Sequence, residues 1–234
     1  MKTLVFYLLA MGIVLIACKK PSNPYDTAIT VMVDETDTLP VYPTTQTLLS
    51  PFKLSDDPWQ GMQISLVGIA DKDVNAIITV SLEKEDRLTG NLTIRRAKVQ
   101  RFITELQNAV ATFRPHKCPR SIIFRAVAEQ ATQLANSAAN KRYLLVFSDL
   151  LENSEVSFYN PQTLALLKNS PATMEKQLQC NIRIPSLNGM QVWFLFAPSS
   201  YSQNNVYMPI ARFYESIYRA HNADVHVATQ FSMP

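Results

Sequence analysis

Short apolar segments rich in β-branched residues alternate along this chain with stretches in which apolar residues recur every three or four positions. The first pattern is typical of buried strands, and the second is typical of amphipathic helices. Strands separated by helices pair mostly in parallel, because a parallel connection needs a long crossover segment. We therefore predict an α/β domain in which helices cover both faces of a mostly parallel sheet.

The order of these segments predicts one antiparallel pair within that sheet. The strands expected at 62–69 and 76–82 are separated only by a turn-like polar segment, so they should form a hairpin. The other expected strands cover 28–33, 143–147, 191–197 and 225–229. Helices are expected at 44–49, 89–113, from Pro119 to 134, in turns over 160–179, and around 210–218.

The N-terminus has the layout of a secretory signal. Lys2 supplies a positive charge, and an apolar run from Leu4 to Ile16 ends in Leu15-Ile16-Ala17-Cys18. This run is shorter than the span of about 20 residues that a transmembrane helix needs. We therefore expect cleavage rather than a membrane-spanning helix.

The four residues Leu15 to Cys18 resemble the lipobox of bacterial lipoproteins, in which the cysteine is acylated and becomes the mature N-terminus. The resemblance implies a signal peptide over 1–17, a lipidated tether over 18–26 and a folded domain over 27–232. It also implies an extracytoplasmic protein of the cell envelope, lipid-anchored to a membrane. The alternative is an ordinary signal or anchor that ends in a cysteine.

Charge and cysteine content exclude some classes of protein. The whole chain carries a formal charge of +3, and Lys2, Lys19 and Lys20 all precede the domain, which is therefore neutral. A neutral domain gives no electrostatic reason to bind nucleic acid, so we expect none. For Cys118 and Cys180 we favour two thiols over a disulfide, because two distant cysteines do not form a disulfide framework.

A polar loop follows the first expected strand and contains Asp34-x-Thr36-x-Thr38. Alternate positions of an extended segment project to the same side, so one carboxylate and two hydroxyls can meet at one point. Ligands that are all oxygen suit a hard cation, Mg²⁺ above all. The alternative is an ordinary polar loop, with its aspartate capping nearby backbone amides.

This loop resembles the start of the metal-ion-dependent adhesion site of von Willebrand factor A (vWA) domains, whose motif is D-x-S-x-S. That family also has an aspartate after its fourth strand, and Phe147-Ser148-Asp149 matches it. Its third element is a hydroxyl residue before a helix, for which Ser121 is the candidate. The chain departs from the family in having threonines for serines, no glycines beside Ser121, and Leu150 where glycine is common.

The resemblance implies a three-layer, Rossmann-like fold with one antiparallel edge strand. It also implies a divalent cation, Mg²⁺ or alternatively Mn²⁺ or Ca²⁺, and a protein partner that completes the coordination with an acidic residue. On this hypothesis the protein is a binding module and not an enzyme. The metal ligands are then Asp34, Thr36, Thr38, Ser121 and Asp149.

Two other functions stay open at this point. A hydrolase could use Asp34 and Asp149 to activate water, with Glu35 or Glu152 as the base. A metal-free structural scaffold with a degenerate site is the other. The sequence contains no G-x-S-x-G elbow, no glycine-rich phosphate loop and no histidine spacing typical of zinc sites.

Two further expectations concern side chains away from the site. The basic residues Arg95, Lys98 and Arg101 share one side of a predicted helix, and we expect a solvated face rather than a patch for an anionic ligand. We expect Trp59 and Trp193 to pack in the core.

Overall fold

The computed structural model describes residues 23–36, 38–70, 77–112, 120–179 and 182–232. Its strands form one six-stranded sheet in the order β3-β2-β1-β4-β5-β6. All neighbouring pairs are parallel except β2 and β3, which form the antiparallel pair at one edge. The strands are β1 (Thr27–Asp34), β2 (Met62–Ile69), β3 (Ile77–Leu82), β4 (Lys141–Phe147), β5 (Met190–Leu195) and β6 (Asp224–Ala228).

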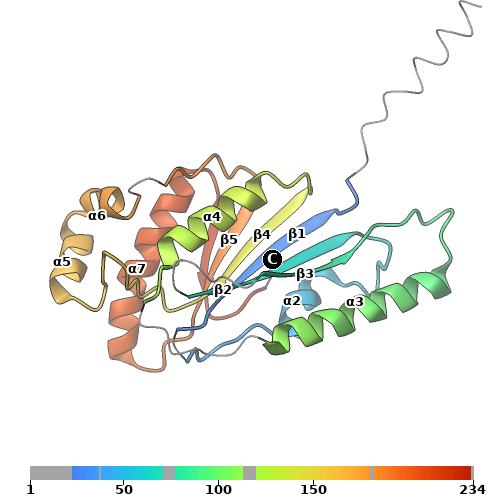
Figure 1. Cartoon of the computed structure of the whole chain (residues 1–234), viewed down its shortest axis with the longest axis horizontal. Coiled ribbons are helices and arrows are strands. Elements are labelled where there is room, and N and C mark those ends of the chain that lie inside the picture. Colours follow the sequence, from blue (N-terminus) through green and yellow to red (C-terminus); the bar gives the residue numbers. More distant parts are fainter. Residues whose placement is uncertain (1–22, 37, 71–76, 113–119, 180–181, 233–234) are drawn as a thin grey trace, which may run out of the picture.

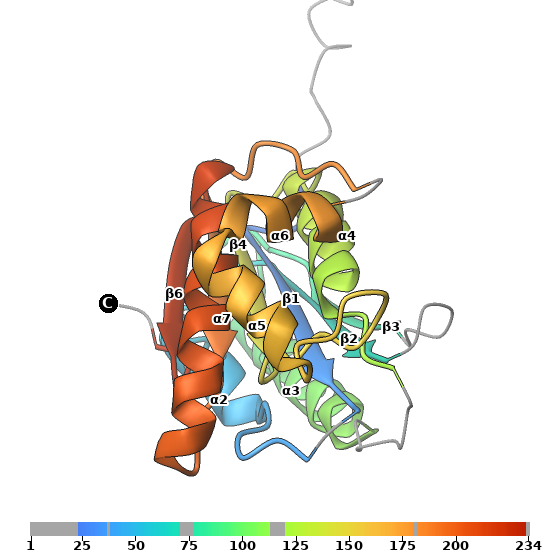
Figure 2. The ribbon, with the colours of Figure 1, turned by 90° about the vertical axis from the view of Figure 1, so that its left-hand side faces the viewer.

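Helices cover both faces of this sheet (Figures 1 and 2). Two consecutive residues of β5 point to opposite faces: Phe194 contacts Tyr214 of α7, whereas Trp193 contacts Phe231. Phe231 in turn contacts Phe52, the last residue of the short 3-10 helix that continues α2, so α2 and α7 lie on different faces. The helices are α2 (Thr45–Leu49), continued by a short 3-10 helix (Ser50–Phe52), α3 (Leu92–Thr112), α4 (Ile123–Ala135), α5 (Pro161–Asn169), α6 (Pro171–Leu178) and α7 (Tyr201–Ala220).

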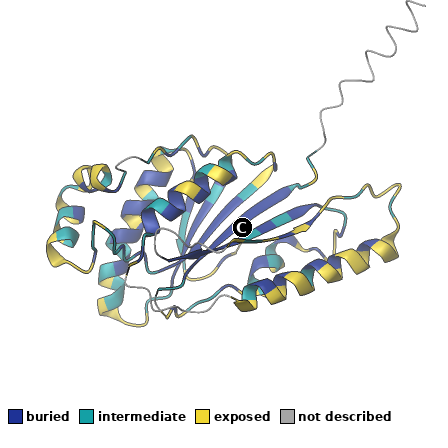
Figure 3. Cartoon of the chain, viewed as in Figure 1, coloured by how far each residue is buried: buried dark blue, intermediate teal, exposed yellow. Residues whose placement is uncertain are grey.

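The architecture confirms the predicted fold class: an α/β domain with a mostly parallel sheet and one antiparallel edge strand. The central strand β1 is buried along all eight of its residues (Figure 3), as expected for a parallel strand covered on both faces. Its register places Asp34 beside Ile69 of β2, and Val33 beside Phe147 of β4. The chain leaves β1 toward β2 and reaches β4 later, so the two neighbours of β1 define the point where the strand order reverses.

Arg95 is buried, so the prediction that it lies on a solvated helix face is wrong. Its guanidinium donates from Nε to the Pro58 carbonyl at 2.5 Å, from Nη1 to the Glu83 carbonyl at 2.7 Å and from Nη2 to the Gln60 carbonyl at 2.9 Å. It therefore joins the first turn of α3 to two loops. Arg101 on the same helix is exposed over 82% of its side chain, as expected.

The two tryptophans differ in burial. Trp193 is 5% exposed and belongs to the core, as predicted. Trp59 is only half-buried and packs beside Gly90, where an added Cβ would lie 2.3 Å from the indole ring. The prediction that Trp59 is a core residue is therefore wrong, because this indole covers a loop at the rim of the sheet.

Some predictions concern parts of the chain outside the described residues. These are the signal segment 1–17, the acylated Cys18, and the pairing state of Cys118 and Cys180. Within the described residues, none of the helices combines the length and the apolar character needed to cross a membrane.

Replacing Arg95 with alanine should lower the free energy of unfolding by about 3–5 kcal/mol, because three loop carbonyls lose a buried charged donor at once. Denaturant unfolding followed by circular dichroism measures this difference. Arg101→Ala, on the exposed side of the same helix, is the control and should change stability by no more than about 0.5 kcal/mol. Equal losses in the two variants would contradict the structural role of Arg95.

Candidate functional site

The candidate site lies at the C-terminal ends of β1 and β4 and is built around Asp34. This side chain is 1% exposed. Its Oδ1 accepts hydrogen bonds from the Thr36 backbone N–H at 3.1 Å and from the Thr36 hydroxyl at 2.6 Å. Its Oδ2 accepts a hydrogen bond from the Ser148 hydroxyl at 2.7 Å, which joins the ends of the two strands.

Ser148 is also fully buried, and its hydroxyl takes part in two hydrogen bonds. While its hydroxyl donates to Asp34, the same oxygen accepts a hydrogen bond from the Leu150 N–H at 2.9 Å. Leu150 has a positive φ of 61°, a backbone conformation that favours glycine. The hydrogen bond from its N–H to Ser148 holds Leu150 in this conformation.

A second buried carboxylate, Glu152, lies near Asp34. Its Oε2 accepts hydrogen bonds from the Ile123 N–H at 2.9 Å and the Phe124 N–H at 2.8 Å, at the start of α4. These amides have no partner within the helix, so an acidic acceptor stabilises the helix there.

The environment of Glu152 favours its protonated form. Burial raises the pKa of Glu152 above its ordinary value, and the negative charge of Asp34 raises it further. Hydrogen bonds from the Ser154 side chain and the two helix amides act in the opposite direction and lower that pKa in part. Asp34 and Glu152 therefore form an electrostatically coupled acidic pair beneath this edge of the sheet.

Ser121 lies at the same edge, just before α4. Its backbone exchanges hydrogen bonds with Asn153 at 3.2 and 2.8 Å. The next residue, Ile122, donates to the carbonyl of Ala70 at the end of β2, beside β1. The Ser121 side chain is 4% exposed, and its hydroxyl has no hydrogen-bond partner among the described residues. A buried hydroxyl in this state is a candidate ligand.

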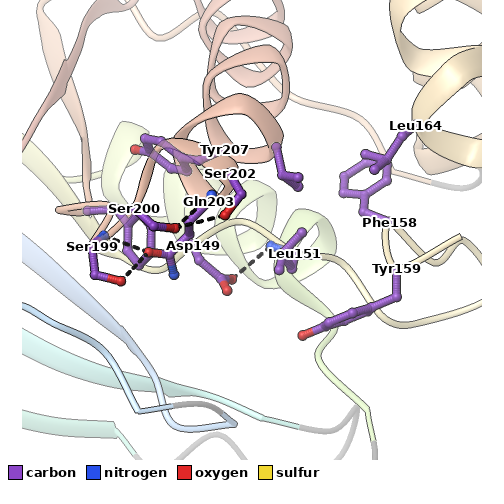
Figure 4. Close-up of a pocket in the computed structure, with 12 residues that line it drawn as sticks. Asp149, Leu151, Phe158, Tyr159, Leu164, Ser199, Ser200, Ser202, Gln203 and Tyr207 are labelled. Atoms are coloured by element: carbon purple, nitrogen blue, oxygen red, sulfur yellow. Dashed lines mark hydrogen bonds between the residues drawn. The ribbon is translucent and has the colours of Figure 1, made fainter. Parts of the chain in front are cut away.

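The remaining two predicted ligands are placed differently. Thr38 is exposed. Asp149 is half-buried, and its Oδ1 accepts a hydrogen bond from the Leu151 N–H at 2.9 Å. The structure therefore brings Asp34 and Thr36 into contact and places Ser121 at the same edge, whereas Asp149 follows Ser148 and lines a neighbouring cavity (Figure 4).

That cavity has a volume of about 540 Å³ and is enclosed by the loop after β4, the start of α5 and the start of α7. Aromatic and aliphatic side chains form much of its wall, and serines of the α7 start form a polar side (Figure 4). Tyr207 lies within it with a hydroxyl that has no hydrogen-bond partner among the described residues. Burial raises the pKa of Tyr207, and the charge of Asp149 raises it further, so this phenol stays neutral.

The donors at this edge fit a hard cation in their chemistry. All are oxygens, and one buried hydroxyl and two coupled carboxylates are among them. No group of three or more His, Cys, Asp or Glu side chains is placed to hold a metal within the described ranges, so a cation here depends on hydroxyl ligands. The amide-capping alternative also agrees with the contacts, since Asp34 and Asp149 both accept backbone N–H bonds.

Ser148 and Glu152 were not among the predicted ligands, although both take part in this arrangement. Only the parallel register shows that Ser148 is the partner of Asp34. Val33 pairs with Phe147, and the next residues of the two strands, Asp34 and Ser148, are joined by a hydrogen bond. Glu152 carries no sequence signal for burial, because its partners are backbone amides of a helix that begins 29 positions earlier.

No protein-family model and no curated protein matches this sequence. Among solved structures, an aerotolerance-related membrane protein from Bacteroides fragilis NCTC 9343, with multiple mutations to serines, is similar over 89% of this chain and 92% of that chain. The two sequences are 12% identical and the TM-score is 0.35. The fold assignment therefore depends on the strand order and pairing described above.

Replacing Glu152 with glutamine should flatten the pH dependence of stability. A carboxyl whose pKa is raised in the folded state binds its proton more tightly there than in the unfolded chain, so stability falls as pH rises from the ordinary value of 4.5 through the raised pKa. Glutamine keeps an oxygen acceptor for the helix amides and does not ionise. The variant should therefore gain stability relative to the wild type as pH rises from acid to neutral.

Denaturant unfolding over that pH range measures the effect. Glu105→Gln, at an exposed position of α3, is the control and should follow the wild-type pH curve. A Glu152→Gln curve parallel to that of the wild type at every pH would show that this carboxyl does not titrate in the expected way.

Proposed function

We propose that this protein is a lipoprotein tethered to a membrane outside the cytoplasm, and that its vWA-like domain binds a protein partner through a divalent cation at the C-terminal edge of β1 and β4. The observation that carries the proposal is the position of Asp34, buried and hydrogen-bonded to Ser148 across the ends of these strands. In open α/β sheets, ligands bind in the crevice at this point of strand-order reversal.

The residues that would hold the cation are Asp34, Thr36 and Ser121, with Thr38 and Asp149 as the further predicted ligands. A bound Mg²⁺ would supply positive charge that offsets the repulsion between buried carboxylates, and an acceptor position for an acidic residue of the partner. The Thr36 hydroxyl donates a hydrogen bond to Asp34, and its oxygen lone pairs could still bind a metal. The Ser148 hydroxyl holds Asp34 in one orientation.

The cavity beside Asp149 supports binding rather than hydrolysis. Among the described residues that line it, Asp149 is the one carboxylate, and none is histidine, lysine or arginine. A hydrolytic site would need a positioned base for water in addition to the metal ligand. Aromatic walls and a polar rim are instead typical of surfaces that contact a protein partner.

The lipid anchor leads to a chemical prediction at Cys18. Cells expressing the protein with a labelled fatty acid should incorporate the label, and mass spectrometry should find the acyl groups on an N-terminal peptide that begins at Cys18. Cys18→Ser should remove the label completely, because the thiol is the acceptor, whereas Cys118→Ser should keep it. Label that persists in the Cys18→Ser variant would contradict the proposed anchor.

The cation is tested with the detergent-solubilised chain by calorimetry with Mg²⁺ and Mn²⁺. Asp34→Ala should weaken metal uptake by at least about 100-fold, because it removes a charged ligand from a site of oxygen donors. Capture of partners from native envelope should be lost in the presence of a chelator and in the same variant. Asp56→Ala, at an exposed loop position, should change neither.

Ser121→Ala is the matched variant that separates metal binding from folding. Its hydroxyl has no hydrogen-bond partner among the described residues, so its removal should leave stability unchanged or slightly higher without metal. Metal uptake should still weaken if this hydroxyl is a ligand. Unchanged uptake and capture in both Asp34→Ala and Ser121→Ala would leave the metal-free scaffold as the function.

A further inference from the structure

Three exposed apolar side chains lie at the turn before α3 and in the first turn of that helix. Leu88 is 94% exposed, Leu92 is 43% exposed and Ile94 is 55% exposed. Among the described residues, six large hydrophobic side chains are exposed, and these three fall within seven consecutive positions. We call them the apolar tip. Exposed leucine and isoleucine side chains at one end of a helix favour contact with an apolar environment, because their exposure to water is unfavourable.

The turn that carries Leu88 is held in place, so this side chain is kept outward. The Leu88 N–H donates to the Asp86 carboxylate at 2.7 Å, and the Gly90 N–H donates to the Asp86 carbonyl at 2.9 Å. Trp59 packs beside Gly90 so closely that an added Cβ would meet its ring. Arg87 pairs with Asp57 at 3.2 Å on the neighbouring loop.

The apolar tip belongs to the edge of the domain where the chain enters the sheet (Figure 1). The Lys84 N–H donates to the Pro24 carbonyl at 2.8 Å, which joins the strand leading to the tip to the segment before β1. The Lys84 ammonium lies 3.8 Å from the Asp26 carboxylate of the same segment. The buried Arg95 joins this region to α3 from within.

The length of the tether limits which surface can reach a membrane. Cys18 lies five residues before Asn23, the first described residue, and five residues span at most about 18 Å. The eight residues of β1 extend over about 26 Å from the end of the sheet where the chain enters to the end that carries Asp34. An anchor at Cys18 therefore allows the apolar tip to reach the bilayer, while Asp34 lies about one strand length further from the anchored end of the domain.

We propose that the apolar tip inserts into the interface of the bilayer to which the chain is anchored, and so orients the Asp34 edge toward the aqueous phase. This inference rests on the proposed lipid anchor at Cys18. Leucine and isoleucine side chains gain free energy at the boundary between headgroups and acyl chains. Lys19 and Lys20 precede the domain and add attraction to anionic headgroups.

The test places a fluorescent reporter at each edge of the acylated full-length chain. Leu88→Trp puts an indole in the tip, and Tyr201→Trp puts one at the start of α7, at the opposite edge. Both positions are strongly exposed, at 94% and 82%, so neither substitution disturbs the core. Each variant is reconstituted into vesicles of phosphatidylethanolamine and phosphatidylglycerol, with or without bromine on the acyl chains.

The brominated lipid should quench the added tryptophan at position 88 about threefold more than that at position 201, because interfacial insertion brings it to the depth of the acyl boundary. Its emission should also shift to shorter wavelength. Trp59 and Trp193 are present in both variants, so their contribution cancels in the comparison.

Three outcomes would contradict the proposal. Equal quenching at the two positions in protein that floats with the vesicles would overturn insertion of the tip but leave the anchor intact. A blue shift at position 88 without quenching by bromine would also overturn it, since a second copy or another protein would then cover the tip. Failure to float with vesicles would overturn the anchor and the inference together.

Discussion

The burial of β1 between β2 and β4 is the constraint on which the rest of the molecule depends. All eight of its residues are buried, because parallel neighbours lie on both sides and helices cover both faces. A one-residue shift in the register of such a strand would move every side chain to the opposite face and disrupt its packing on both faces. The register of the sheet therefore places its last residue, Asp34, beside Ser148. This register determines the geometry of the candidate site.

Buried charges are stabilised differently at the N-terminal and C-terminal ends of the strands. At the edge where the chain enters, the cation of Arg95 donates to three loop carbonyls and pairs with the Glu85 carboxylate at 3.3 Å. At the opposite edge, Asp34 and Glu152 are both acids, and hydroxyl and amide donors stabilise them. Donors reduce the cost of burying a carboxylate, but they do not remove the repulsion between two of them.

That repulsion gives the C-terminal edge a reason to bind positive charge, and it connects our two proposals. In the proposed function, a bound cation would lower the electrostatic energy of Asp34 and Glu152 at this edge. The tether and the apolar tip belong to the other side. If both proposals hold, a protein attached by one edge would present the opposite edge to partners in solution, so membrane attachment and partner binding would not compete for the same surface.

The sequence alone determined the fold class, since the apolar runs of β1 and β4 and the apolar periodicity of α4 and α7 follow from local propensity and burial pattern. It also made Asp34 a candidate ligand by its position after a strand, and the resemblance to vWA domains made Ser121 a candidate before a helix. Only the tertiary structure decided that Arg95 is buried, that Ser148 is the partner of Asp34, and that Asp149 lines a cavity. The physical reason is that long-range packing chooses hydrogen-bond partners that lie up to 114 positions apart, which no local pattern encodes.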